Sequence, residues 1–392
     1  MSAHLHEWLS LAIRWLHVVA GIVWIGESFY FMWLDASLQR DEQTPEGVKG
    51  ESWSVHGGGF YRVIKFQVAP ESMPEHLHWF KWEAYTTWIT GVFLLAVVYW
   101  LQAGAFMVDA GGPVSAGASV GIGVGTLVIG WVVYDQLCKS PLRKAPWALA
   151  GVLLLYVAAV AHGLTQVLSP RAAFIHVGAM VGTWMAGNVA MVIIPNQQKI
   201  VASLLKGEEP DPRFGPMGKI RSTHNNYLTL PVVFVMISNH YPSTYGHPWN
   251  WLILLGLFAV GALSRVYFNQ RNAGQILPWV PPVAAVLFLS LALVSAPKAL
   301  PEAEGAATWA EVGPILQTHC VGCHSASPTD EIFKTAPNGV TYDTPEQASA
   351  KAALIKARAV DTQTMPLGNK TGMTEQERAT LGAWIAAGAP IP

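Results

Sequence analysis

The chain has 392 residues, of which 52% are hydrophobic and only 12% are charged, and its formal net charge at pH 7 is −1. Soluble domains usually carry about 25% charged residues, so this composition excludes an ordinary soluble domain and is typical of a membrane protein. We therefore expect the chain to be surrounded by a lipid bilayer, and we expect no nucleic-acid partner.

Several apolar segments reach the length of about 20 residues that a helix needs to cross a bilayer. They lie at residues 8–34, 84–104, 115–138, 147–168, 172–195, 226–240, 249–268 and 279–297, the sixth with a more polar lead-in from 222. We predict an all-α bundle of about eight spans over residues 1–297. The first span should be retained, because it is rich in Trp and no Lys or Arg lies before it, unlike a signal peptide.

The one sizeable polar insertion of the membrane part is residues 36–82, which we place in the cytoplasm. Within it, Gly57-Gly58-Gly59 is followed by a stretch rich in Tyr, Val, Ile and Phe. Such a stretch favours a short strand or a hairpin. The glycines are either a plain turn or a point where backbone approaches a ligand closely.

Four histidines lie within or at the ends of the apolar segments: His17, His162, His176 and His240. Ionisable groups inside a bilayer are costly and usually functional. Small residues beside His17 and His176 leave room for a flat macrocycle, so two facing imidazoles are expected to bind a b-type haem. His17 and His176 are the first candidates as iron ligands, and the alternative for each histidine is a hydrogen-bonded packing role.

A second group of polar residues lies at the cytoplasmic ends of the second and sixth spans. The group consists of Glu83, Arg221, His224, Asn225 and Asn226. These carboxylate, imidazole and amide groups suit a small, planar, polar substrate, with Glu83 or His224 as the proton acceptor. The alternative is an ion pair of Glu83 with Lys81 or Arg221, with the asparagines capping a helix.

The C-terminal part is expected to be a linker, 298–308, followed by a small all-α domain, 309–392. A helix should run from Trp309 toward His319, and a closing helix should begin after Thr374. Between them lies Cys320-Val321-Gly322-Cys323-His324. This C-x-x-C-H pattern is the attachment signature of a c-type haem.

In a c-type site, Cys320 and Cys323 would form the thioether bonds to the porphyrin and His324 would bind the iron. The second axial ligand is commonly a Met in a loop before the last helix. Met365, in Met365-Pro366, is favoured over Met373 for this role. The C-terminal domain is therefore similar to small c-type cytochromes.

The orientation follows from the haem motif and from the distribution of positive charge. Covalent attachment of haem c takes place outside the bacterial cytoplasm, so the C-terminal domain should be periplasmic, and eight spans place the N-terminus there too. On the predicted cytoplasmic side there are fifteen Lys and Arg residues, whereas Arg171 alone lies on the outer side before the tail. This asymmetry obeys the positive-inside rule. We predict a multi-pass protein of the bacterial inner membrane.

Several longer motifs give the chain a family resemblance over nearly its whole length. They are His56–Tyr61, Trp79–Thr86, Thr223–Tyr227 and Ser238–Pro242, together with Cys320–His324 and Met365-Pro366. With these motifs the chain resembles the PuuD-type membrane-bound urate hydroxylases of purine catabolism, in which an eight-helix domain is fused to a cytochrome c. The resemblance implies oxidation of urate to 5-hydroxyisourate with oxygen from water. It also implies that electrons leave through cytochrome c to a soluble cytochrome or a terminal oxidase.

Two other functions fit the same architecture. The surroundings of His17 resemble the first helix of HemJ-type protoporphyrinogen oxidases, which makes a porphyrinogen or quinol dehydrogenase an alternative. A non-enzymatic electron-transfer subunit of a terminal oxidase is the other. For urate oxidation, a substrate site at the cytoplasmic surface would lie about 30 Å from the haem of the tail, so a membrane haem would be needed as a relay. If the substrate instead binds near the outer histidines, the relay is unnecessary and those histidines become substrate ligands.

Overall fold

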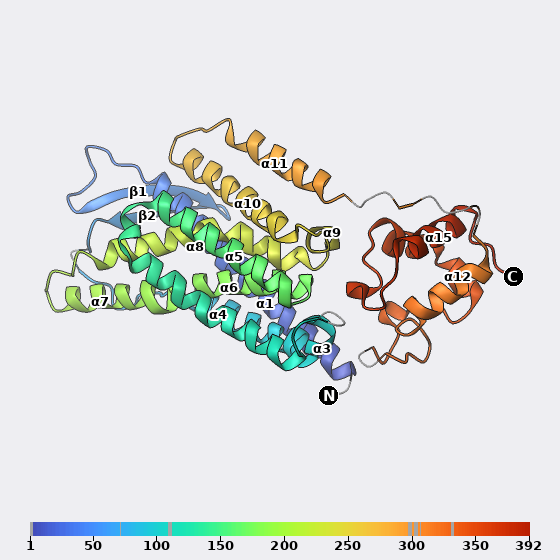
Figure 1. Cartoon of the computed structure of the whole chain (residues 1–392). Coiled ribbons are helices and arrows are strands. Elements are labelled where there is room, and N and C mark those ends of the chain that lie inside the picture. Colours follow the sequence, from blue (N-terminus) through green and yellow to red (C-terminus); the bar gives the residue numbers. More distant parts are fainter. Residues whose placement is uncertain are drawn as a thin grey trace.

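The structure is a computed structural model that describes residues 3–70, 72–108, 112–296, 300–301, 305, 307–330 and 333–392. Most of the described chain is helical, in a long bundle and a smaller tail (Figure 1). The bundle contains α1 Ala3–Ser37, α2 Trp82–Leu94, η1 Leu95–Tyr99, η2 Trp100–Gln102, α3 Ala103–Phe106, α4 Ala116–Lys139, η3 Pro141–Lys144, α5 Pro146–Val167, α6 Pro170–Gly187, η4 Asn188–Ile193, α7 Ile194–Leu205, α8 Phe214–Ser238, α9 Pro242–Tyr245, α10 Asn250–Asn272 and α11 Val280–Val294.

Six helical segments of the described chain are long and apolar enough to cross a membrane, as far as length and composition decide. They are His4–Ser37, Trp82–Phe106, Ala116–Lys139, Pro146–Val167, Pro170–Leu205 and Asn250–Asn272. Of the two further predicted spans, the sixth is α8, which is long but carries many polar residues. The eighth is α11, which has 15 residues. These helices are consistent with a membrane protein.

Helix α6 is the centre of the bundle. In the apolar 18-residue stretch of the segment that begins with α6, 61% of the residues are buried. In the corresponding stretch of every other candidate span, at most 28% are buried. Helix α6 packs against α2, α4, α5 and α8. The helix that begins as α6 continues through the π-helical η4 into α7 and ends at Leu205, ten residues beyond the predicted span. Buried residues of the bundle are therefore concentrated on α6, on η4 and on the helices that pack around them.

Close contact between α6 and α8 requires a glycine at position 178. A Cβ atom added to Gly178 would lie 2.3 Å from Cγ1 of Val235, whereas one added to Gly182, a turn later on α6, would meet nothing within 4 Å. We expect Gly178→Ala to lower the free energy of unfolding by about 1–3 kcal/mol, the usual cost of overpacking. Gly182→Ala is the matched control and should be neutral or slightly stabilising.

The comparison is made on detergent-solubilised protein, as the temperature at which each variant loses its monodisperse elution peak. Equal temperatures for Gly178→Ala and Gly182→Ala would contradict the close approach of α6 to α8.

The predicted hairpin in the insertion is confirmed, and it is the exception to the all-α prediction. β1 Val48–His56 and β2 Gly59–Phe66 pair antiparallel, with His56 opposite Gly59. Gly57 and Gly58 form the two-residue turn with φ of 58° and 81°, both in the region that glycine adopts at low cost. Nothing lies within 4 Å of a Cβ built on either residue, so these glycines form an open turn.

The tail contains eight short helical elements. They are α12 Trp309–Leu316, η5 Gln317–Val321, η6 Pro337–Gly339, α13 Pro345–Ala350, α14 Ala352–Ile355, η7 Lys356–Asp361, η8 Leu367–Asn369 and α15 Glu375–Ala386, as far as the tail is described. The predicted first and closing helices are α12 and α15. Each has a capping box, Thr308 with Glu311 and Thr374 with Glu377. The two helices pack together, with the rings of Trp309 and Trp384 5.8 Å apart.

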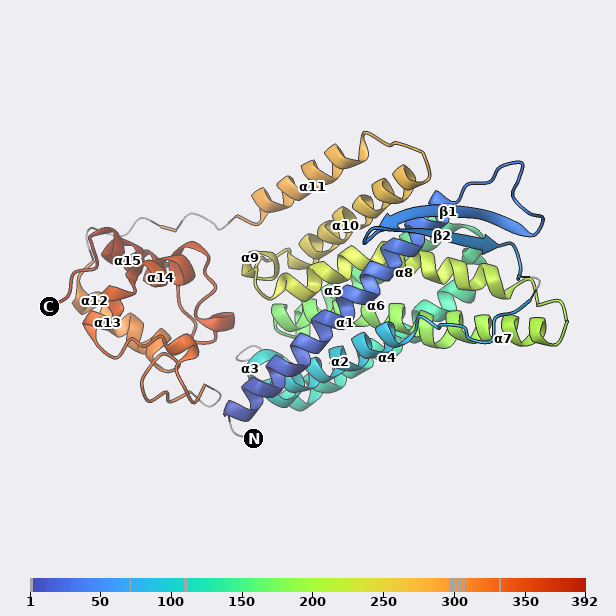
Figure 2. The same ribbon diagram turned by 180° about the vertical axis from the view of Figure 1, so that it is seen from behind.

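The predicted linker, 298–308, lies largely outside the described residues, which include only 300, 301, 305, 307 and 308 of it. The N-terminal end of α1 and the tail lie at one end of the bundle, which we call the tail end (Figures 1 and 2). The hairpin lies at the opposite end, which we call the hairpin end. Because the start of α1 and the tail lie at the same end, this arrangement agrees with an even number of membrane crossings.

Candidate functional site

The C-x-x-C-H motif follows α12 directly, in and just after η5. Cys320 and Cys323 are free thiols, both half-buried, and Cys320 packs against the apolar core of the tail. Nδ1–H of His324 donates to the carbonyl oxygen of Val340 at 3.0 Å. This bond fixes the tautomer and leaves the lone pair of Nε2 for a metal, the usual arrangement of a histidine ligand. The residues present therefore fit a covalently attached haem c.

The two methionines considered as the second ligand have different surroundings. Met365 is half-buried, and its backbone is held on both sides: its N–H donates to Arg358, and its carbonyl accepts from Nη1 of Arg378 at 2.7 Å. Met373 is buried in the apolar core of the tail with 4% of its surface exposed. Met373 therefore has a packing role in this structure, and Met365 lies on a fixed loop with a partly open side chain.

His17 lies on α1 against α2. Its Nδ1 is 2.9 Å from the carbonyl oxygen of Thr87 and 3.0 Å from Oγ1 of Thr90, so Nδ1 carries the proton and donates. A Cβ on Gly91 would lie 3.1 Å from Cε1 of His17, so the glycine allows the ring to approach α2. His17 is thus a hydrogen-bonded interhelical residue whose Nε2 keeps its lone pair.

His176 is fully buried and uses both ring nitrogens. Nδ1–H donates to the carbonyl oxygen of Ala172 at 2.8 Å, and Nε2 accepts from the indole N–H of Trp100 at 3.1 Å. His162 is exposed beside Trp251, with ring centroids 5.2 Å apart, and His240 is exposed at the end of α8. No ring nitrogen of His176 is left for iron in this arrangement.

The structure does not bring His17 and His176 together. His17 contacts α2 at Gly91, and His176 contacts the continuation of the same helix at Trp100. These positions lie about 13 Å apart along the helix axis at 1.5 Å per residue. Two imidazoles on one metal, each at about 2 Å from it, would have to face each other within about 4 Å. His17 and His176 therefore do not fit as the two ligands of one haem b.

At the hairpin end, three of the predicted catalytic residues meet in one buried network on α4, η4 and α8. Nη2 of Arg221 pairs with Asp135 at 2.7 Å, and its Nη1 donates to Asn188 at 3.0 Å. We call this set the Arg221 network; it consists of Tyr134, Asp135, Asn188, Arg221, His224 and Asn225.

Further contacts within the Arg221 network engage most of the polar groups of its members. The amide nitrogen of Asn188 donates to Tyr134 and to Asn225, and the amide nitrogen of Asn225 donates to the carbonyl oxygen of Met185. The hydroxyl of Tyr134 lies 2.9 Å from Nδ1 of His224. Most of these groups bind one another, and among the described residues the contacts of His224 involve Nδ1 and leave Nε2 open.

Asn226 and Glu83 lie apart from this network. Asn226 is also fully buried, but its amide contacts Ser28, Arg265 and Asn269. Consecutive helix positions point about 100° apart, so Asn225 and Asn226 face different neighbours. Glu83 is the second residue of α2, and its Oε2 is buried with no hydrogen-bond partner among the described residues. The structure therefore brings together Arg221, His224 and Asn225 but not Asn226 or Glu83.

Sequence reasoning missed Tyr134, Asp135, Asn188 and Arg265 as members of these clusters. Asp135 lies within the third apolar segment, and a carboxylate inside a span is the kind of residue that marks a buried site. Among the described residues, no group of three or more His, Cys, Asp or Glu side chains forms a metal site.

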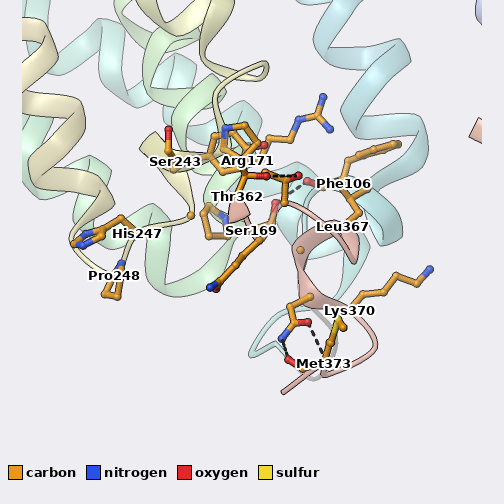
Figure 3. Close-up of a pocket in the computed structure, with 18 of the residues that line it drawn as sticks. Phe106, Ser169, Arg171, Ser243, His247, Pro248, Thr362, Leu367, Lys370 and Met373 are labelled. Carbon is orange, nitrogen blue, oxygen red and sulfur yellow. Dashed lines mark hydrogen bonds between the residues drawn. The ribbon is translucent and has the colours of Figure 1, made fainter. Parts of the chain in front are cut away.

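A cavity of about 730 Å³ lies between the tail end of the bundle and the tail (Figure 3). The bundle contributes the ends of α3 and α11, the start of α6, and α9 with the loop after it. The tail contributes Phe333, the residues on both sides of Met365, and the start of α15. The phenyl rings of Phe106 and Phe333 meet beside it with centroids 6.3 Å apart. None of the predicted substrate-binding residues lines this cavity.

The long apolar helices and the small tail with two capped helices define a helical protein of the membrane type, and the tail carries a Cys-x-x-Cys-His sequence. Residues 3–296 match the family model described as urate oxidase N-terminal, and the chain belongs to this family. Comparisons with curated proteins and with solved structures gave no significant match. The match ends before α12, so it covers the bundle and not the tail.

Proposed function

We propose that the protein is a urate dehydrogenase of the bacterial inner membrane. Urate and water give 5-hydroxyisourate, two protons and two electrons, and the electrons pass by way of a haem c in the tail to a soluble cytochrome or a terminal oxidase. The observation that carries the proposal is the match of residues 3–296 to the urate oxidase N-terminal family. The haem-attachment motif in the same chain supports an acceptor other than dioxygen.

In this proposal the bundle crosses the membrane eight times, with α8 and α11 as the two further spans, and both termini are periplasmic. The proposal is supported by the position of the N-terminus and the tail at one end of the bundle. It is also supported by the concentration of Lys and Arg at the hairpin end.

The residues proposed to hold the haem are Cys320, Cys323, His324 and Met365. When bound, haem c supplies a one-electron acceptor whose potential is raised by the thioether ligand. The hydrogen bond from His324 to Val340 keeps the ring in one orientation, and the contacts of Arg358 and Arg378 keep the Met365 loop in place. We assign Arg221, His224, Asn225 and Asn226 a structural role, because their polar groups bind one another and their neighbours.

The test is an absorption spectrum of the pure protein under anaerobic conditions, recorded before and after addition of urate. We expect urate to reduce the covalently bound haem and 5-hydroxyisourate to form, with no hydrogen peroxide. A haem that is reduced by a quinol or a porphyrinogen and does not respond to urate would contradict the proposal.

A further inference from the structure

The location of the urate site is constrained by electron transfer, so the following inference depends on the proposed function. A site at the hairpin end would lie about 30 Å from the tail, across the bilayer core. The first candidates for a membrane haem, His17 and His176, do not meet on one iron, and most polar groups of the Arg221 network bind one another. A site at the tail end needs no relay.

The cavity at the tail end is next to the proposed haem ligand. Its wall on the tail side includes Thr362, Gln363, Thr364 and Leu367, which flank Met365 on both sides in the chain (Figure 3). Its volume of about 730 Å³ lies within the range of about 300–1,000 Å³ typical of ligand pockets. A molecule bound there is separated from the Met365 loop by no other element.

The cavity contains a cation on the side of the protein where cations are scarce. Apart from Arg14 within α1, Arg171 is the only Lys or Arg at this end among the described residues of the bundle. Its guanidinium lies over the rings of Tyr99 and Phe106, at 5.9 and 5.5 Å from their centroids. The positive-inside rule disfavours such a residue here, so its presence calls for a local role.

Arg171 is held in place but keeps hydrogen-bonding capacity. Its Nε donates to Oδ1 of Asn239 at 3.2 Å and its side chain also hydrogen-bonds Tyr99, so the remaining N–H donors of its five are open to a ligand. The other two cations of the cavity wall are engaged: Lys370 pairs with Asp330, and Arg378 donates to backbone carbonyls of the tail. Arg171 is also in the first turn of α6, where the helix dipole favours an anion.

Hydroxyl groups complete the polar lining on the bundle side. Ser243 and Tyr245 come from α9, which packs against α6. Burial raises the pKa of the Tyr245 hydroxyl, so near neutral pH the group is uncharged and both donates and accepts hydrogen bonds. A cation, neutral hydroxyls and the rings of the cavity wall match a flat anion with carbonyl and ring N–H groups.

We propose that this cavity is the urate site, that Arg171 binds the anionic ring system, and that urate enters from the tail side of the membrane. Nothing in this assignment requires passage of urate through the bundle. It also accounts for the separation of His17 and His176, which do not share one iron.

Binding is measured directly with radiolabelled urate on the pure, haem-loaded protein. We expect Arg171→Gln to weaken urate binding roughly tenfold or more, the loss usual for a hydrogen bond to a charged group. Tyr245→Phe, which removes one hydroxyl and little volume, should weaken binding several-fold. Arg143→Gln makes the same change in charge at an exposed position outside the cavity and should bind urate like the wild type.

The side of entry is measured in sealed vesicles of both orientations. Urate added to right-side-out vesicles, with the tail facing the medium, should reduce the haem at once, whereas inverted vesicles should respond only after permeabilisation.

The proposed function and the placement of the urate site are contradicted by different results. Wild-type protein that neither binds nor responds to urate would contradict the proposed function and the site with it. Wild-type binding that Arg171→Gln and Tyr245→Phe leave unchanged, or a response confined to inverted vesicles, would contradict only the placement of the site.

Discussion

Replacement of both Cys320 and Cys323 by serine is expected to abolish covalent haem attachment and, with it, all urate-dependent electron transfer to an external acceptor. Each thioether bond needs a cysteine sulfur, and serine offers no equivalent. Both cysteines are free and half-buried beside His324. They are the only two cysteines in the sequence of the tail, so no other thiol there can take their place. The measurement is haem staining after denaturing electrophoresis, together with urate-driven reduction of an added acceptor.

The third cysteine provides the matched control. Cys138 is buried in α4, at the Arg221 network, and has no part in the motif. Cys138→Ser should keep the covalent haem stain at the level of the wild type. A double variant that still carries covalent haem, or still passes electrons from urate, would contradict the assignment of the motif.

The Arg221 network should dominate the stability of the bundle at the hairpin end. The side chains of Arg221 and Asp135 are only 6% and 11% exposed. Asp135→Ala leaves the buried guanidinium without its partner, and removing one member of a buried pair costs about 3–5 kcal/mol. We expect a large fall in the unfolding temperature of the detergent-solubilised protein.

An exposed pair of the same residue types serves as the control. Arg213 and Asp211 are also 2.7 Å apart, but the arginine is 81% exposed. Exposed ion pairs contribute about 0–1 kcal/mol, so Asp211→Ala should leave the unfolding temperature nearly unchanged. If Asp135→Ala unfolded at the wild-type temperature and only its urate turnover were lost, the network would have to be reassigned to the substrate.

Much of the fold followed from local patterns. Thr374 with the acids after it predicted the start of α15, because a capped first turn is encoded within four residues. The glycines before Phe60 indicated the hairpin for the same reason. Helix α8 was less predictable, since its polar first half has no apolar signal and is held by the contacts of Arg221, His224 and Asn225.

The sites were harder to predict than the helices because they depend on contacts between distant segments. Asn225 and Asn226 are adjacent in sequence and form one motif, yet their amides belong to separate clusters. The sequence around His176 is typical of a haem ligand, but its Nε2 accepts a hydrogen bond from the indole N–H of Trp100. The cavity is formed by short segments of the bundle and the tail, and only Arg171, as an isolated cation, hinted at it.

The placement of the chain ends bears on how the protein can be tagged. The start of α1 and the tail lie at one end of the bundle, and the loop between α1 and β1 lies at the other. Reporters fused to either terminus should therefore report the same compartment. A short epitope inserted in the loop between α1 and β1 should report the opposite compartment, and it would disturb neither the tail nor the cavity beside it.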